Sequence, residues 1–292
     1  MVRRRFITDG EQLELFTIYP SSSDIRSKQV RDLMTWGMFN ISNHHKHRLR
    51  HEQGEMFVDV AATNGKGIAT YHDNDILIFL TSHLVQAMNE GKDVSSRIFF
   101  TAHEFFRFSR REHISGTRYN QIWNALWRLQ DTFVHTNINI VGGNEIESRW
   151  NWLSEIHRIK SSRTGKSLGF QVVLADPLYK SIVQDKPRVL TLDNDYFTLR
   201  SGFLKWLYLY ARKSAGTDPD NEWLATERML HSRCGSSLHL TQFRKMLKHA
   251  VDQGSLLDYD LKHAMLGRER AVAFHRKKFL PRATHRTTIV KE

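Results

Sequence analysis

The sequence predicts an α+β protein made of two tandem winged helix-turn-helix domains. Three observations indicate this fold class. Short runs with alternating apolar residues are typical of strands, while longer segments place apolar residues at helical spacing. The order helix, turn, helix and hairpin, which a winged helix requires, occurs in both halves of the chain. The length of 292 residues also favours about two domains, at roughly 150 residues each.

The composition of the chain limits the kinds of molecule that it is expected to bind. A net charge of +12 and a sequence pI near 9.8 indicate an acidic partner, either nucleic acid or an anionic membrane surface. Strictly apolar runs such as Ile76 to Leu80 are far shorter than the ~20 residues that span a bilayer, so no membrane role is expected. The basic start MVRRRF has no apolar stretch behind it, and the single cysteine, Cys234, excludes an internal disulfide. We therefore expect a soluble cytosolic protein.

Residues 1–55 are polar and basic, and we expect a partly flexible N-terminal arm there. This arm contains SNHHKHRLRHE, with histidines at 44, 45, 47 and 51. Rolling-circle nickases place two histidines around one bulky apolar residue on a strand, but here Lys46 separates His45 from His47, and its charge would lie against the cation. No cysteine pair or set of carboxylates completes a metal cage. The stretch is expected to supply positive charge near DNA, and no metal ligand is predicted.

The first winged-helix domain is predicted over residues 56–185. Met56 to Val60 and Gly67 to Tyr71 form an expected hairpin around Thr63-Asn64-Gly65-Lys66, and Asp73 then caps an apolar helix that stops at Gly91. Thr101 and Glu104 fit a capping box at the start of a short second helix. A third helix, TRYNQIWNALWRLQDT, places four apolar residues on a buried face: Tyr119, Ile122, Leu126 and Leu129.

The hairpin of this first domain is expected to join FVHTNINIV to WNWLSEIHRIK through GGNEIES. Its turn contains Glu145 and Glu147, which would repel a phosphate backbone, so the first domain is expected to serve partly in protein contact. A later stretch, Thr164 to Ser167, contains TGKS. A phosphate-binding loop requires glycine where Lys160 stands, so we expect a plain hairpin turn there.

The second winged-helix domain is predicted over residues 186–280, followed by a basic tail at 281–292. Asp193 is expected to cap a helix through FLKWLYLYARKS, and LATERMLHSRCG to form the next helix. LHLTQFRKMLKHAVDQG forms a third, with four residues on its buried face: Leu240, Phe243, Leu247 and Ala250. SLLDYDLKHAM and AVAFHRK then flank a basic turn, Gly267 to Arg270.

Candidate DNA contacts follow from the outward faces of the third helix in each domain. Asparagine and glutamine suit adenine, and arginine suits guanine or phosphate. In the first domain these residues are Arg118, Gln121, Asn124 and Arg128. In the second they are Thr241, Gln242, Arg244, Lys245, Lys248 and His249, with Arg268 and Arg270 in the hairpin turn. From Arg268 to the end there are eight Lys or Arg against two Glu, so the second domain is the stronger candidate.

Several long segments resemble the replication initiator protein A family of bacterial plasmids. They are GIATYHDNDILIFLTSHLVQAMNEG, FTAHEFF, YNQIWNALWRLQDTFVHTNI and VLTLDNDYFTLRSGFLKWLYLYARKSAG, in the order that the family has. These segments begin at Gly67 and run, with gaps, across roughly two-thirds of the protein. The resemblance implies tandem winged helices and an initiator of the bacterial cytoplasm that binds repeated DNA sites at a plasmid origin, helps to melt the duplex and recruits host replication proteins.

We therefore expect a sequence-specific DNA-binding initiator that is not an enzyme and needs no cofactor. Two unlike winged helices in one chain fit direct repeats, with contact patches about one helical turn (~10 bp) apart. The sequence leaves the balance between monomer and homodimer open. Two alternatives remain open: a winged-helix transcriptional repressor, and a metal-dependent rolling-circle nickase.

Overall fold

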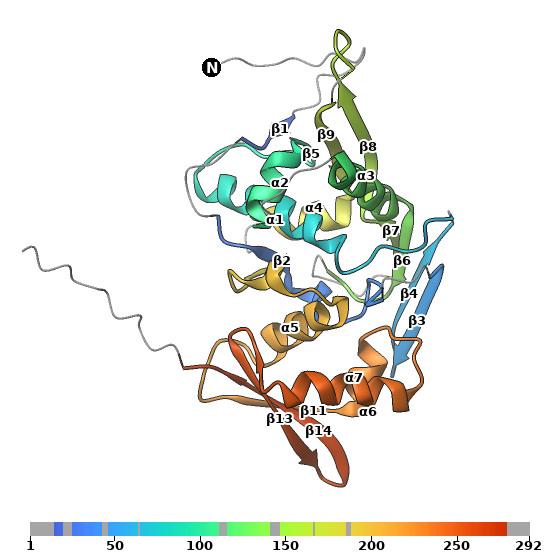
Figure 1. Cartoon of the computed structure of the whole chain (residues 1–292), viewed down its shortest axis with the longest axis vertical. Coiled ribbons are helices and arrows are strands. Elements are labelled where there is room, and N and C mark those ends of the chain that lie inside the picture. The colour runs from blue at the N-terminus through green and yellow to red at the C-terminus, as the bar shows by residue number, and fades with distance from the viewer. Residues whose placement is uncertain are drawn as a thin grey trace, which may run out of the picture.

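The computed structural model of this chain describes residues 15–19, 25–42, 46–63, 65–110, 116–140, 147–165, 167–184 and 188–278. Two units of similar construction lie along the long axis, and helix α5 (Gly202–Ser214) of the second unit lies on the side that faces the first (Figure 1). Buried side chains from both units form one continuous apolar core, in which Phe39, Tyr71, Trp152 and Trp206 are fully buried. No helix in the described ranges is both long and apolar enough to cross a membrane.

The first unit has the order helix, strand, helix, helix, strand, strand. Its elements are α1 (Asn74–Asn89), β5 (Arg97–Phe100), α2 (Ala102–Phe108), α3 (Gly116–Asp131), β8 (Leu153–Lys160) and β9 (Ser167–Leu174). The sheet order is β1-β5-β9-β8, with β1 at Phe16–Thr17. The predicted capping box at the start of α2 is confirmed, since Thr101 Oγ1 accepts from Glu104 N–H and Glu104 accepts from Thr101 N–H.

The second unit repeats that order. Its elements are α5 (Gly202–Ser214), β11 (Glu222–Thr226), α6 (Glu227–Arg233), α7 (Leu240–Asp252), β12 (Ser255–Leu256), β13 (Tyr259–Leu266) and β14 (Glu269–Arg276). The sheet order is β11-β14-β13-β12, so the last strand lies between the first strand and its own hairpin partner, as in β5-β9-β8. The predicted strands on either side of the basic turn at Gly267 are confirmed.

A third sheet corrects two predictions about the strands of the first half. Its order is β3-β4-β6-β7, from Arg48–Gln53, Met56–Ala62, Thr132–Thr136 and Ser148–Asn151. The predicted pairing of Met56–Val60 with Gly67–Tyr71 is wrong, because β4 pairs with β3 and β6 instead. The expected hairpin after α3 is also different: β6 and β7 pair, but they extend this third sheet, and the hairpin of the first unit is β8–β9.

The prediction of a separate N-terminal arm up to residue 55 is wrong for its described part. The expected boundary falls in the turn between β3 and β4, where Gly54 has φ 60°. Residues 27–42, here called the seam segment, lie between the two units and contain the buried side chains of Leu33, Met34 and Phe39. The apolar residues of the seam segment follow neither helical nor strand spacing in the sequence. They are buried because the two units cover the segment on two sides.

The seam segment binds both units. Its strand β2 (Lys28–Val30) pairs with β10 (Val189–Thr191), and Gln29 Nε2 donates to Asn74 Oδ1 in α1 at 3.1 Å. Gly37 N–H donates to the Arg233 carbonyl at the end of α6 at 2.6 Å. A Cβ at Gly37 would lie 2.3 Å from the Cys234 backbone, so only glycine allows this approach.

Two helix boundaries also differ from the predicted ones. Helix α5 begins after Ser201 rather than at Asp193, because residues 196–198 form a separate 3₁₀ turn, η2 (Tyr196–Thr198). Asp193 Oδ1 instead accepts from Asp195 N–H. Helix α6 begins after Thr226, and the preceding Leu224-Ala225-Thr226 belongs to β11, whose partner β14 lies about 50 residues later in the chain. The short helix α4 (Asp176–Val183) links the first unit to β10.

Candidate nucleic-acid interface

Helix α7 presents the polar face that the sequence predicts. Phe243, Leu247 and Ala250 are buried beneath it, as expected from their spacing. Five of the predicted contact residues are exposed on the opposite side: Thr241, Gln242, Lys245, Lys248 and His249. Lys248 Nζ lies 2.5 Å from Asp252 Oδ2, one helical turn further on, which partly neutralises that end of the face. The pKa of the Asp252 carboxyl is lowered by this contact and by His263.

The β13–β14 hairpin extends beside α7. Met265 pairs with Arg270 and Leu266 with Glu269 across the two strands, and Gly267 has φ 61° in the turn. This positive φ is what the first central position of a type II′ turn requires. Residues 265–270 are all exposed, so Arg268 and Arg270 project from the end of the hairpin. Both lie where the sequence predicts a basic turn.

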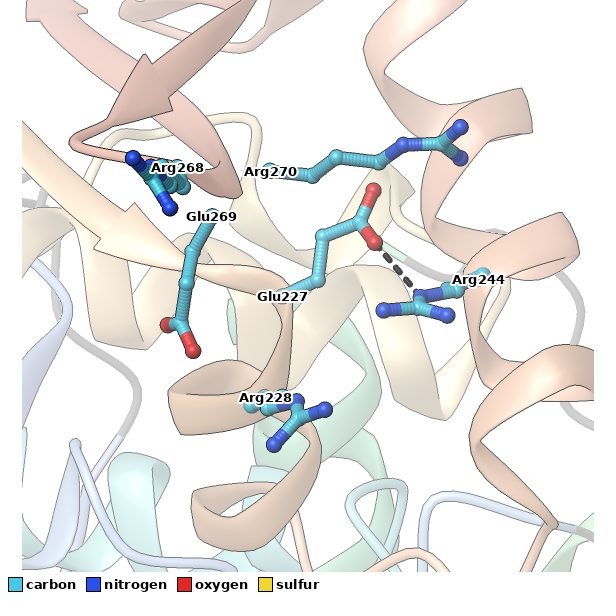
Figure 2. Close-up of a pocket in the computed structure, with 6 residues that line it drawn as sticks. All are labelled: Glu227, Arg228, Arg244, Arg268, Glu269 and Arg270. Atoms are coloured by element: carbon cyan, nitrogen blue, oxygen red, sulfur yellow. Dashed lines mark hydrogen bonds and ion pairs between the residues drawn. The ribbon is translucent and has the colours of Figure 1, made fainter.

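Helices α6 and α7 and the hairpin border a solvent-open cavity of about 230 Å³. Six residues line it: Glu227, Arg228, Arg244, Arg268, Glu269 and Arg270. Figure 2 shows the Glu227 carboxylate pointing toward Arg244, whose Nε lies 2.7 Å from Glu227 Oε2. Four arginines against two glutamates give the lining an excess of two positive charges. Guanidinium groups bind phosphate oxygens in bidentate geometry, so this cavity suits an anionic phosphate group.

The ion pair with Glu227 leaves Arg244 only partly available for contact with a ligand. Thr226 Oγ1 caps α6 by accepting from Met229 N–H, which fixes Glu227 in the first turn of that helix. Glu227 is largely buried, while the Arg244 side chain is 38% exposed. The carboxylate therefore holds one edge of the guanidinium and leaves part of it accessible. Glu227 and Arg228 were not among the predicted contact residues, because they lie on α6 rather than on the predicted contact helix.

Three of the four candidates on α3 keep an outward or half-exposed position. Gln121 is exposed and Arg118 half-exposed, and Asn124 Oδ1 accepts from Lys66 Nζ at 2.8 Å. Trp127, on the same helix, is 40% exposed, with the Lys66 ammonium 3.9 Å from its ring centre. The α3 face therefore combines polar groups with an aromatic ring.

The prediction that Arg128 faces DNA is wrong. Its Nε donates to Asp73 Oδ2 at 2.8 Å and its Nη2 to Asp73 Oδ1 at 2.6 Å. Asp73 is almost fully buried at the start of α1 and also accepts from Thr70 N–H. Arg128 thus joins α3 to α1 and serves the fold.

The turn of the β8–β9 hairpin corresponds in position to the turn of β13–β14, although no contact role was predicted for it. Lys160 at the end of β8 and Arg163 in the turn are both exposed, and Gly165 has φ 64°. The expected plain turn at TGKS is confirmed by the pairing of β8 with β9. Glu145 lies outside the described residues. Glu147 directly precedes β7 of the third sheet, and its Oε1 lies 2.6 Å from His135 Nε2, so it does not lie in this turn.

The histidine-rich stretch is only partly described. His44 and His45 lie outside the described residues, while Lys46 Nζ donates to Ser237 Oγ and His47 is exposed. His51 is directed inward and stacks on Trp36, with ring centres 5.8 Å apart. Burial lowers the pKa of His51 to about 4. His51 is therefore neutral at pH 7, and the prediction that it supplies positive charge is wrong. Among the described residues, no three His, Cys, Asp or Glu side chains are grouped to hold a metal ion.

The two repeated units, the second of which carries an arginine-lined pocket beside α7, define a protein with a surface suited to a polyanion. The sequence model of the replication initiator protein A family matches residues 28–261, so this chain belongs to that family, and the predicted resemblance is confirmed. Membership gives the protein a role in the initiation of replication.

A putative replication protein of Wigglesworthia glossinidia brevipalpis is 29% identical over 216 residues, which is 73% of this chain and 76% of that protein. The fold is similar to crystal structures of domains 2 and 3 of RctB. One, of selenomethionine derivatives, has a TM-score of 0.60 at 10% identity and covers 86% of this chain and 99% of that one. The other has a TM-score of 0.53 at 12% identity and covers 85% and 96%.

Proposed function

We propose that this protein initiates plasmid replication by binding direct repeats of origin DNA through two tandem winged helices. In this proposal α3 and α7 enter successive major grooves, and the hairpins β8–β9 and β13–β14 are the wings. The observation that supports it best is the arginine-lined pocket between α6, α7 and β13–β14, because it places guanidinium groups that can hold phosphate beside the helix face proposed to contact bases.

The repeated sheet order supports two winged helices. In each unit the strand between the first two helices is covered by the last strand of the hairpin: β5 by β9, and β11 by β14. This leaves the third helix of the unit and the hairpin turn outward. A helix-turn-helix with an added hairpin uses those two elements for groove and backbone contact.

Rigid coupling of two unlike units favours direct repeats. Lys205 Nζ in α5 lies 2.9 Å from Asp75 Oδ1 in α1, and both side chains are buried. The seam segment adds hydrogen bonds to both units. The two halves therefore present different residues in one fixed orientation, which suits a site without dyad symmetry, with contact patches about one helical turn (~10 bp) apart.

We further propose that the protein acts in the bacterial cytoplasm as a binding protein, without catalysis or cofactor. Its contacts would help to open the duplex and recruit host replication proteins. A homodimer remains an open part of this proposal.

Nuclease footprinting across the DNA around the protein's own gene tests the proposal. We expect several protected direct repeats; one inverted repeat would instead favour a transcriptional repressor. If about six to eight phosphates are neutralised, log K should fall against log salt with a slope of roughly −5 to −7. A slope shallower than about −2 would contradict a grip by two domains.

Two further assays address initiation and catalysis. The gene and its flanking DNA, placed on a fragment with no other origin, should replicate in a bacterial host. Supercoiled plasmid should remain supercoiled when it is incubated with the protein and Mg²⁺ or Mn²⁺. Relaxation of that plasmid would favour the nickase alternative.

A further inference from the structure

The end of the β13–β14 hairpin presents two large apolar side chains to solvent. Met265 is 57% exposed and Leu266 is 45% exposed, next to the turn at Gly267. Most exposed apolar residues are scattered singly, but these two are adjacent and project at the tip of a protruding ribbon. Their exposure therefore calls for a partner.

The hairpin is longer than the core requires. Leu261 and Phe274 pair near its base and are buried. Toward the tip, Val272 and Ala271 are the last buried residues of β14. Beyond Ala271 every residue up to Met265 on the other strand is exposed. Because side chains alternate across a strand, Met265 and Leu266 cover opposite faces of the ribbon just before the turn. The tip is thus a thin projection with an exposed apolar side chain on each face, and its arginines border the pocket that the hairpin shares with α6 and α7.

The charges beside this tip identify the partner. Arg268 lies in the turn, Arg270 is directly opposite Met265, and Lys262 is exposed further along β13. Glu269, directly opposite Leu266, is the one acid among residues 265–270, so basic side chains outnumber it. An apolar tip flanked by arginines complements the DNA minor groove, where negative potential attracts arginine and apolar wedges enter between base pairs. A purely apolar protein partner would gain nothing from this concentration of arginine.

The other hairpin provides an internal comparison. The turn that follows β8 contains Ser161, Ser162, Arg163 and Thr164, all polar. Such a turn can contact phosphates but has no side chain suited to separate stacked bases. Strand β9 exposes a single leucine, Leu168, just after this turn, so an adjacent pair of exposed apolar side chains distinguishes β13–β14 from this hairpin.

We propose that Met265 and Leu266 form a wedge that enters the minor groove, separates one base step and kinks origin DNA. This inference rests on the proposed function, because it requires the second unit to lie on duplex DNA. Arg268 and Arg270 hold the phosphates on either side while the apolar side chains replace the lost stacking contacts. The kink weakens the duplex beside the bound repeat, which is where an initiator must open it.

The test compares the double variant Met265→Ser/Leu266→Ser with the wild type and with Met56→Ser. Met56 is an exposed methionine on β4, away from both proposed wings, so it controls for loss of surface apolar area. Energy transfer between dyes at the two ends of a duplex that contains one repeat reports the bend, and fluorescence anisotropy reports affinity. Circular dichroism melting confirms that each variant is folded.

The wild type and Met56→Ser should bend the duplex by roughly 20–90°. The double variant should lose at least about half of this bend and bind about tenfold more weakly. On a duplex with a mismatch at the kinked step, its affinity should return to within about twofold of the wild type, because the bases are already unstacked.

The outcomes separate the two proposals. If the wild type does not bind repeat DNA, both the proposed function and the wedge are overturned. If it binds without bending, or if the double variant bends DNA as much as the wild type, only the wedge is overturned. Equal weakening on intact and mismatched DNA would also overturn it, because the two side chains would then contribute affinity without unstacking.

Discussion

Lys205 of α5 and Asp75 of α1 form a buried ion pair between the first helices of the two units. Lys205 Nζ lies 2.9 and 3.1 Å from the two carboxylate oxygens, and it also lies 4.3 Å from the ring centre of Tyr196. Both side chains are almost fully buried, so the pair lies inside the common core rather than on a surface between domains. The two units are therefore expected to unfold together.

Removal of one partner of this pair should destabilise the whole protein. Lys205→Met leaves the Asp75 carboxylate buried without its lysine, and such a change costs about 3–5 kcal/mol. The double variant Asp75→Leu/Lys205→Met should lose less than the single variant, because apolar replacement of a whole buried pair is often close to neutral. Urea denaturation measures both. A single variant as stable as the wild type would contradict this role.

Arg244 and Lys245 should have different effects on DNA binding although they are neighbours. If Arg244, held by Glu227, contacts guanine, Arg244→Ala should cost ~1–3 kcal/mol and relax preference at one base position. Lys245→Ala, as a phosphate contact, should weaken all sequences about equally and reduce the salt slope by about one. Binding to a cognate and a scrambled repeat measures both, with melting temperature as the folding control. Full affinity in Arg244→Ala, with loss of binding in Gln121→Ala, would assign base recognition to α3.

Arg128 and Gln121 share a helix but should affect different properties. Arg128→Ala removes both hydrogen bonds to the buried Asp73 and should lower the free energy of unfolding by on the order of 3 kcal/mol. The exposed Gln121→Ala should change stability by less than about 0.5 kcal/mol. Thermal melting and DNA binding, measured together on both variants, check this. The assignment of Arg128 to the fold fails if its alanine variant melts normally but loses DNA discrimination.

The β8–β9 turn should contribute to phosphate binding. Lys160→Ala/Arg163→Ala removes two exposed charges and should make the salt slope shallower by about two. The matched control is Lys92→Ala/Lys180→Ala, which also removes two charges but from lysines that already pair with Glu90 and Asp176. An equal change in slope for both double variants would mean that only net charge matters.

Stability should fall as the pH is lowered from about 6.5 toward 4. Burial lowers the pKa of both His51 and His83 to about 4, so in the unfolded chain these rings take up protons at a higher pH than in the folded protein. The unfolded state binds more protons in this window, and each histidine removes about 1.4 kcal/mol of stability per pH unit. Urea denaturation between pH 7 and pH 5 measures this loss. His51→Gln should reduce its slope.

The elements that were predicted correctly are those whose defining residues are close together in the sequence. The buried stripe of Phe243, Leu247 and Ala250 has helical spacing, and the capping box at Thr101 involves residues three apart, so both were predictable. The two strands around Gly267 were predictable for the same reason, because a short turn joins them.

Long-range partner choice could not be predicted in this way. The strands β6 and β8 have similar alternation, and only tertiary pairing shows that β8 belongs to the hairpin of the first unit. Helical spacing correctly placed Arg128 off the apolar stripe of α3, but it could not show that Asp73, 55 residues earlier, lies against that side. Glu227 was missed for the same reason: its importance depends on Arg244, 17 residues away on another helix.

The seam segment also sets the order in which the protein can be completed during synthesis. Lys28, in β2, meets Thr191 of β10 across a separation of 163 residues. At translation rates of about 5–20 residues per second, β2 leaves the ribosome roughly 8–33 s before its partner strand exists. Until then the apolar side chains of Leu33, Met34 and Phe39 have only the first unit to cover them. The join between the two units is therefore closed late in translation, after the first unit has been made.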